Sequence, residues 1–448
     1  MGAASSNGGL FIFSQTCTAY PSPILSRSGF QKPRDQTPHS INQLHERYAE
    51  SLAPLSTKPL DSKRPADPSY LPKTMKSLRY YGRGDIRIDE IPPQPCGPDE
   101  VRIKIAFCGI CGSDLHEYLG GPLLIPKAGE KHPHTGAEIP ITMGHELSGV
   151  LVDVGSEISS SGRLAVGQRV VINPCISDRQ LGFPPCGACE EGKTNCCQRF
   201  AGYGLSGHGG GFSEYLVVKG SHVFRLPDSV SLEIGALVEP LAVAWHCVRI
   251  SGFQPGQDVV VLGGGPIGLA LLLVLKVRKA RTIIVSEVLE MRQQYARSFG
   301  ADFVINPLEE QETGVNPVVA KAREVSGEQG GGVHVVFDTT GVQKTFDTAV
   351  ASTRTGGVVF NVAIHENPLL INLNDITTAE KKLMGGMCYT DDDFKAVIDM
   401  LDKGLIDAKP MITSIVPLDS AITKGFQELI ERKEFHVKIL VQPHPHPV

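Results

Sequence analysis

The sequence predicts an α/β protein built from a β-rich part and a doubly wound parallel sheet. From about residue 75, short alternating stretches lie between Gly and Pro turns, a pattern typical of antiparallel strands. From about residue 240, apolar strands alternate with helical segments, which is typical of a parallel sheet with crossover helices. A chain of 448 residues is also long for a single core, so we expect two domains.

The expected elements follow one another along the chain. The β-rich part contains the strands KSLRYYG, DIRIDEIP, DEVRIKIAFCG, LSGVLVDVG and RVVINP. The parallel sheet contains the strands DVVVLGG, TIIVSE, VHVVFDTTG and GGVVFNVA and the helices PIGLALLLVLKVRKA and EMRQQYARSFGA. The tail is mixed and ends in the strand-like FHVKILVQP. We therefore divide the chain into an extension (1–74), a β-rich part (75–239), a parallel-sheet domain (240–372) and a C-terminal part (373–448).

Residues 1–74 differ in composition from everything that follows. They are rich in Ser, Pro and Gly and show little hydrophobic periodicity, so we expect a disordered or processed extension. No acidic residue precedes Asp35, which fits a transit peptide loosely. The opening MGAASS also fits the loose pattern for myristoylation of Gly2. Both interpretations stay open beside that of an inert extension.

Composition and charge exclude several classes of protein. A formal net charge of −5 gives no basic footprint for nucleic acid, and no apolar run reaches the length of a membrane span. Eleven cysteines, several of them in pairs, favour metal ligation in a reducing compartment over a disulfide scaffold. We expect a cytoplasmic protein, with the mitochondrion as the alternative, whose partner is a small molecule.

A glycine-rich turn follows the first strand of the parallel sheet and opens a helix. In VVVLGGGPIG the glycines permit a tight turn, close approach of the pyrophosphate and close helix–strand packing. Glu287 stands where an acidic residue binds the ribose hydroxyls, which favours NAD over NADP, while Arg292 nearby could soften that preference. The candidate cofactor residues in the turn are Gly263, Gly265, Pro266, Ile267 and Gly268.

Three separated segments supply the ligand types of an open zinc site. A catalytic zinc ion takes three protein ligands and keeps one position open. Cys111 in GICGSD, His145 in MGHE and Glu239 in LVEPLAVAWH offer a thiolate, an imidazole and a carboxylate. Their spacing alone does not bring them together.

These segments nevertheless resemble a known family. GICGSDLHEY, TMGHELSGVLVDVG, GGFSEYLVV and GALVEPLAVAWH are similar to motifs of the zinc-dependent medium-chain alcohol dehydrogenases, and most similar to the branch of butanediol and sorbitol dehydrogenases. The resemblance runs from about residue 75 to the C-terminus. It implies a GroES-like catalytic domain, interrupted in sequence by a Rossmann NAD-binding domain, with the active site in the cleft between the two.

The resemblance also implies a role for each residue of the site. Cys111, His145 and Glu239 correspond to the catalytic zinc ligands. Glu146 either lies behind the ligands or exchanges with the zinc-bound water. Asp114 corresponds to the carboxylate that orients the zinc histidine. Two further positions, Ser113 and His116, correspond to the proton relay.

A second zinc site is less complete in the sequence. The family's structural zinc uses four cysteines, and Cys186, Cys189 and Cys197 match the last three of them. Phe183 stands where the first should be. The candidates for the fourth ligand are Cys175, Cys196 and, as a weaker one, Asp178. Since three thiolates make a poor closed site, the sequence leaves open whether a structural zinc ion binds here.

The expected activity is zinc-dependent hydride transfer between NAD and a secondary alcohol or vicinal diol, of the butanediol/acetoin or polyol type. The loop 121–140 could reshape the pocket for a bulkier, specialised metabolite. A zinc-free reductase would lack the ligand set, and a catalytically silent NAD-binding regulator is expected to have lost a site residue. The resemblance implies a homodimer or homotetramer.

Overall fold

The computed structural model describes residues 71–309, 314–327, 331–365 and 367–444, all of which belong to one compact unit, Pro59–Val448. The predicted extension lies outside the described residues apart from its last four positions. The predicted α/β class is confirmed, since an antiparallel β-rich part and a parallel sheet are both present. Within the described residues, no helix has the length and apolar character needed to cross a membrane.

The main sheet of the β-rich part is antiparallel except for the parallel pair of β17 and β18. Its order is β10-β6-β5-β3-β18-β17, with β9 also paired to β3. A smaller sheet has the order β2-β1-β4, and β7 pairs with β8. Alternate residues of β3, among them Val101, Ile103 and Ile105, are fully buried, which fixes the register of the central strand. The strands are β1 (Met75–Gly82), β2 (Asp85–Ile91), β3 (Glu100–Gly109), β4 (Ile141–Thr142), β5 (Glu146–Val154), β6 (Arg169–Ile172), β7 (Cys175–Ile176), β8 (Ala201–Gly202), β9 (Tyr215–Lys219), β10 (Val223–Arg225), β17 (Ile412–Pro417) and β18 (Lys438–Gln442).

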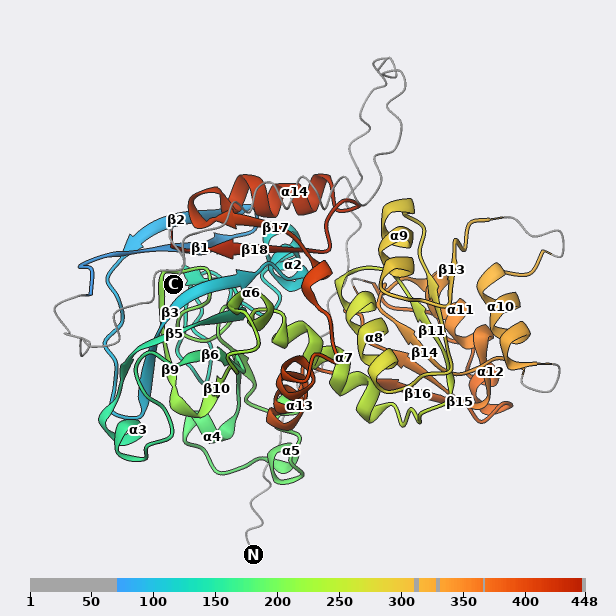
Figure 1. The fold of residues 1–448 in the computed structure, drawn as a ribbon, viewed down its shortest axis with the longest axis horizontal. Helices are drawn as coiled ribbons and strands as arrows, with labels where there is room; N and C mark the ends of the chain where they lie inside the picture. Colours follow the sequence, from blue (N-terminus) through green and yellow to red (C-terminus); the bar gives the residue numbers. More distant parts are fainter. Residues whose placement is uncertain (1–70, 310–313, 328–330, 366, 445–448) are drawn as a thin grey trace, which may run out of the picture. The chain divides into compact units, whose positions relative to one another are not determined.

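The parallel sheet has the order β13-β12-β11-β14-β15-β16. Helices α8 and α9 lie on one face of this sheet, and α10 and α11 lie on the other (Figure 1). Val259 and Val261 of β11 face one hydrophobic core, whereas Val260 and Leu262 face another, so the strand is apolar on both sides. The elements are β11 (Asp258–Leu262), α8 (Pro266–Val277), β12 (Thr282–Ser286), α9 (Glu290–Ser298), β13 (Phe303–Ile305), α10 (Pro317–Ser326), β14 (Val333–Asp338), α11 (Gln343–Ser352), β15 (Thr353–Asn361) and β16 (Lys382–Gly385).

The order of the parallel strands reverses between β11 and β14. In open α/β sheets a ligand binds at such a reversal, outside the carboxyl ends of the strands. The glycine-rich turn follows β11 directly, so it lies at this point of the sheet. The fold therefore puts the predicted cofactor turn at the position where a dinucleotide binds.

The structure differs from the predicted domain division at its C-terminal boundary. β16 pairs in parallel with β15, so the parallel sheet continues past residue 372 into the segment assigned to the C-terminal part. β16 is short and mostly exposed at the edge of the sheet, which is why its sequence lacks a strong apolar run. The chain returns to the antiparallel sheet only at β17 and β18, and β18 pairs with β3.

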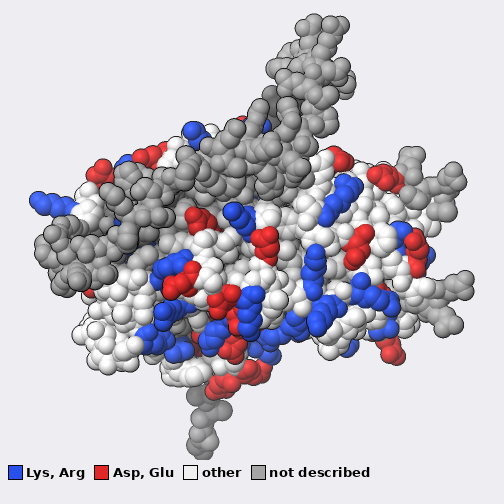
Figure 2. Space-filling view, viewed as in Figure 1, with Lys and Arg blue, Asp and Glu red and all other residues white. Residues whose placement is uncertain are grey.

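The remaining helices connect these sheets. Helix α7 carries the predicted ligand Glu239 in its first turn, and its residues share one hydrophobic core with α8 and β11. On the face shown in Figure 2, basic and acidic side chains are interspersed. The helices are α2 (Gly112–Gly120), α3 (Ser156–Ser160), α4 (Asp178–Leu181), α5 (Gly187–Glu190), α6 (Leu232–Gly235), α7 (Val238–Ile250), α12 (Leu373–Thr377), α13 (Asp391–Asp402) and α14 (Gln427–Glu431).

Candidate active site and metal centres

The N-terminus of α2 presents a thiol and a hydroxyl side by side. Cys111 is the N-cap of this helix, and its backbone N–H donates to Oδ2 of Asp114 at 2.9 Å. This is a capping box in which the cysteine side chain accepts from the third helical N–H. Ser113 in the same turn places its Oγ 3.2 Å from Nε2 of His145. The local sequence CGSD therefore fixes three of the predicted site residues.

Cys111, His145 and Glu146 form a group that can hold a metal ion. One ligand atom from each lies within 4.8 Å of the other two. In the described part of the chain, Oδ1 of Asp114, Nδ1 of His145 and Oε2 of Glu146 are buried without a hydrogen-bond partner. Nδ1 of His145 lies 3.7 Å from Oδ1 of Asp114. A ring nitrogen that faces a carboxylate in this way leaves Nε2 as the nitrogen for the metal.

Glu239 lies beside this group but, among the described residues, is not part of it. The carboxylate is buried, and its Oε1 accepts a 2.7 Å hydrogen bond from the hydroxyl of Tyr389. It is near enough to interact electrostatically with His145 and Glu146. The structure thus brings two of the three predicted ligands together and places two carboxylates near them. The assignment of Glu239 as ligand and of Glu146 as its neighbour stays a prediction.

Lys438 and Tyr389 also belong to the site, although the sequence did not single them out. Nζ of Lys438 lies 2.7 Å from Oε1 of Glu146 and also donates to the carbonyl of Ile110 at 3.1 Å. A lysine at the start of the buried strand KILVQ was the available signal, because a charge that is fully buried needs a partner. No comparable signal marks Tyr389, since a tyrosine is ordinary in a core.

The protonation of the site reflects its burial. Burial raises the pKa of Asp114 to about 6 and that of Glu239 to about 7, although His145 opposes both shifts. Burial lowers the pKa of His145, but Asp114 and Cys111 outweigh it and raise that pKa well above its usual value. Burial also raises the pKa of Tyr389, which keeps its hydroxyl a donor. Buried acidic groups with unpaired atoms are what a divalent cation would stabilise, and a thiolate, an imidazole and a carboxylate suit zinc.

His116 lies one helical turn after Ser113 on α2. Positions three residues apart share a face of a helix, so the two predicted relay residues lie on the same side of α2. Both side chains are half-buried. This position between the buried site and the surface is compatible with passing a proton outward.

The glycine-rich turn has the backbone that a pyrophosphate needs. Gly263 has a φ of 105°, a left-handed conformation that favours glycine. A Cβ on Gly268 would collide with the carbonyl of Gly263, so only glycine fits there as well. Helix α8 begins with Pro266 and Ile267, and its first N–H groups point out of the helix end.

Glu287 and Arg292 lie beside this turn. The carboxylate of Glu287 accepts from the N–H of Gly264 at 2.8 Å, which fixes it next to the turn at the end of β12. A Cβ built on Gly265 would lie 3.6 Å from Nη1 of Arg292, so the guanidinium stands close to the second glycine of the motif. Nη2 of Arg292 donates to the carbonyl of Lys433. These residues fit a dinucleotide with its phosphates at the turn and its ribose at Glu287.

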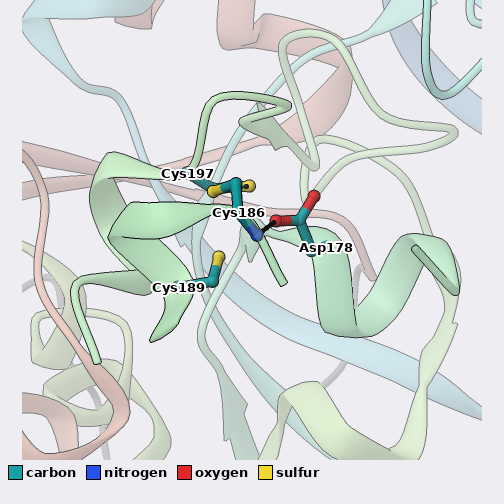
Figure 3. A group of neighbouring side chains, drawn as sticks. All are labelled: Asp178, Cys186, Cys189 and Cys197. Carbon is teal, nitrogen blue, oxygen red and sulfur yellow. Dashed lines mark hydrogen bonds between the residues drawn. The ribbon is translucent and has the colours of Figure 1, made fainter. Parts of the chain in front are cut away.

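A second group of metal-capable side chains consists of Asp178, Cys186, Cys189 and Cys197. Their ligand atoms all lie within 4.8 Å of one another, and Figure 3 shows them converging. The three cysteines match the sequence prediction, and Asp178 at the start of α4 takes the fourth place.

Hydrogen bonds reach the carboxylate and two of the sulfur atoms of this second group, whereas burial raises the pKa of Cys189 and that of Cys197. Arg199 donates to Oδ1 of Asp178 at 2.7 Å and holds the pKa of that carboxyl well below its usual range. The N–H groups of Gln198 and Arg199 lie 3.5 Å and 3.3 Å from the sulfur atoms of Cys186 and Cys197. The N–H of Gln198 is the main cause that lowers the pKa of Cys186.

Phe183 stands in the sequence position of the missing cysteine. It lies under the guanidinium of Arg199, whose centre is 5.0 Å from the ring centroid, and it contacts the ring of His134. Within the described residues, neither Cys175 nor Cys196 belongs to the group. The geometry therefore favours Asp178 as the fourth ligand, although its residue type made it the weakest of the three candidates.

Comparison with known proteins agrees with this geometry. Residues 97–228 match the model of the alcohol dehydrogenase GroES-like domain, and residues 266–403 match that of the zinc-binding dehydrogenase. The chain is 38% identical to (R,R)-butanediol dehydrogenase from Saccharomyces cerevisiae over 387 residues, which cover 83% of this chain and 99% of the relative. It is 40% identical to (R,R)-butanediol dehydrogenase from Bacillus subtilis over 370 residues, with 83% and 100% covered.

Solved structures give the same result. The crystal structure of 2R,3R-butanediol dehydrogenase from Bacillus subtilis matches with a TM-score of 0.74 at 40% identity, covering 83% of this chain and all of that one. An Escherichia coli alcohol dehydrogenase complexed with NADH matches with a TM-score of 0.71 at 26% identity, with 83% and 100% covered. The chain is an oxidoreductase whose cofactors are Zn²⁺ and NAD(H). It belongs to the zinc-dependent medium-chain alcohol dehydrogenases, near their butanediol dehydrogenase branch.

Proposed function

We propose that this enzyme transfers a hydride between NAD and a secondary alcohol or vicinal diol, with butanediol and acetoin as the first candidates. The observation that carries the proposal is the convergence of Cys111, His145 and Glu146 within 4.8 Å. This group offers the ligands of an open zinc site in a chain that also carries a dinucleotide turn. The butanediol dehydrogenases among its relatives support the choice of substrate.

When bound, Zn²⁺ acidifies a substrate hydroxyl group and NAD accepts the hydride. The protein's own residues hold these groups and move one proton. Cys111 and His145, with Glu239 or Glu146, hold the metal, while Asp114 fixes the ring of His145 from the opposite side.

Ser113 and His116 move the proton. Oγ of Ser113 is 3.2 Å from Nε2 of His145, so this hydroxyl stands at the edge of the metal site. It accepts the proton that the substrate hydroxyl loses and passes it towards His116 on the same face of α2. The imidazole of His116 then passes the proton to solvent.

The experiment for this function measures NADH formation with purified protein, NAD and a panel of diols, polyols and simple secondary alcohols, with and without a zinc chelator. We expect turnover on a vicinal diol that the chelator abolishes. Turnover confined to a bulkier alcohol would assign a specialised metabolite instead. Zinc and NADH binding without turnover on any alcohol would indicate a silent binder and contradict the proposal.

A structural role is proposed for the second metal group, with Asp178 as the fourth ligand beside Cys186, Cys189 and Cys197. A complete set of four ligands without an open position is typical of a structural zinc site. The pairing of Asp178 with Arg199 offsets part of the negative charge of three thiolates and one carboxylate. The number of zinc ions per chain tests this assignment.

For assembly we propose a homodimer or homotetramer in which β16 pairs edge to edge with a second copy. β16 is the last strand of its sheet, and Leu383 on it is 43% exposed. An uncovered edge with an exposed apolar residue is a template for strand pairing. Sedimentation of the wild type and of Leu383→Lys tests the assembly.

The free thiols of all ten described cysteines support the cytoplasm as the compartment.

A further inference from the structure

A buried hydrogen bond joins Tyr389 to Glu239. The hydroxyl lies 2.7 Å from Oε1 of the carboxylate, and the two side chains are only 1% and 8% exposed. Glu239 stands in the first turn of α7, 150 residues before Tyr389. The bond leaves Oε2 as the oxygen that can take a place in the metal site.

The surrounding contacts hold both partners of this bond in place. Tyr389 follows Cys388, which has a φ of 45°, a strained left-handed conformation for a residue with a side chain. Four residues further on, Asp393 accepts from Nδ1 of His246 at 2.7 Å and from Nε of Arg249 at 2.6 Å. Both donors lie in the last turns of α7. The segment 389–393 therefore holds α7 at both ends, at Glu239 and at His246 and Arg249.

The two carboxylates near Cys111 and His145 have partners of different charge. Glu146 is paired with the ammonium group of Lys438 at 2.7 Å, whereas Glu239 has the neutral hydroxyl of Tyr389. The pair with Lys438 adds the attraction of two opposite charges to the hydrogen bond, and a neutral hydroxyl lacks this contribution. Both bonds use Oε1, so Oε2 of either carboxylate can face a metal, and Oε2 of Glu146 is buried without a hydrogen-bond partner among the described residues. Glu239 is the carboxylate whose orientation depends on a neutral hydroxyl rather than on an ion pair.

We propose that Tyr389 is a positioning residue that holds the carboxylate of Glu239 in the orientation of a metal ligand. This inference rests on the proposed function and on Glu239, of the two carboxylates it names, as the one that binds the catalytic zinc ion. Outer partners that orient a ligand commonly change metal affinity about 10- to 100-fold when they are removed. Tyr389 acts on the metal through Glu239, because its hydroxyl donates to that carboxylate.

The test compares zinc affinity in the full-length holoenzyme, measured by competition with a chromophoric chelator. The phase that belongs to this site is the one that Cys111→Ser abolishes. Tyr389→Phe is expected to raise the dissociation constant of that phase about 10- to 100-fold. Tyr80→Phe is the matched control, because Tyr80 is another fully buried tyrosine whose hydroxyl has no hydrogen-bond partner within the described residues. It should leave the constant unchanged.

A double-mutant cycle separates positioning from a general loss of packing. In the background of Glu239→Ala, Tyr389→Phe should have no further effect on the dissociation constant. Equal affinity in wild type and Tyr389→Phe overturns the proposal, as does an effect that persists without Glu239. If Tyr389→Phe does not fold, Tyr389→Met serves in the same cycle. A wild type without any Cys111-dependent zinc phase would instead overturn the proposed function.

Discussion

Nζ of Lys438 lies 2.7 Å from Oε1 of Glu146, and neither side chain is more than 2% exposed. The pair joins β18, near the end of the chain, to the first residue of β5, next to the predicted zinc ligand His145. A pair buried this deeply is costly to break, because the remaining partner keeps its charge without solvent.

Lys438→Met should therefore lower the free energy of unfolding by about 3–5 kcal/mol, because it leaves the carboxylate of Glu146 buried and unpaired. Urea unfolding followed by fluorescence measures this change. Lys438→Met combined with Glu146→Gln should recover part of the loss, since the unpaired charge is gone. Equal stability of Lys438→Met and wild type would show that the pair contributes nothing.

Asp178→Ala should reduce the zinc content from two ions per chain to one, because only three thiolates remain in the second group. Elemental analysis of the purified protein measures the content, and thermal unfolding should occur at a lower temperature. Cys196→Ser is the control, since this exposed cysteine is adjacent to Cys197 but outside the group. If Asp178→Ala keeps two zinc ions and Cys196→Ser loses one, the fourth ligand is Cys196.

Glu287→Ser should lower kcat/KM for NAD about 10- to 150-fold, because a lost hydrogen bond to a charged group costs about 1.5–3 kcal/mol. The same change should raise kcat/KM for NADP, because the carboxylate no longer repels a 2′-phosphate. Initial rates with each cofactor measure both effects. Adding Arg292→Gln to the Glu287→Ser variant should lower kcat/KM for NADP again. An unchanged ratio of the two cofactors would contradict the role of Glu287.

The pH dependence of stability should carry a contribution from His222. Burial lowers the pKa of this histidine to about 4, and its Nδ1 lies 2.7 Å from the carbonyl of Asn173. The unfolded chain takes up this proton near pH 6.5, so the contribution is complete above that pH and is lost as the pH falls towards 4. Its full size is about 3 kcal/mol, at about 1.4 kcal/mol per pH unit.

Chemical unfolding at a series of pH values tests this assignment. The free energy of unfolding of His222→Gln should depend less on pH than that of the wild type between about pH 6.5 and 4. His208→Gln, which changes an exposed histidine, should follow the wild type. If the free energy of unfolding changes with pH by the same amount in all three proteins, His222 is not responsible for the pH dependence.

The sequence predicted those parts of the molecule whose residues lie close together in the chain. The dinucleotide turn could be derived because a strand, a glycine-rich turn and a helix follow directly. Cys111 and Asp114 are likewise fixed by one capping box. The edge strand β16 was not predicted, because a short exposed strand has no apolar periodicity.

The rest of the site depends on contacts between distant segments. Glu239 and Tyr389 are 150 residues apart, and Glu146 and Lys438 are 292 residues apart. No local spacing encodes such pairs, so only a resemblance could place Glu239, and nothing pointed to Tyr389. Asp178 was one of three candidates until the geometry placed it with the three cysteines.

The most direct test of zinc-dependent hydride transfer measures zinc content and butanediol-dependent NADH formation together, in the wild type and in Cys111→Ser. We expect the variant to lose one zinc ion per chain and all turnover, while the metal in the group of Asp178 and the three cysteines is retained. Turnover that survives in Cys111→Ser, or in wild type stripped of zinc by a chelator, would contradict a zinc-dependent hydride transfer at this site.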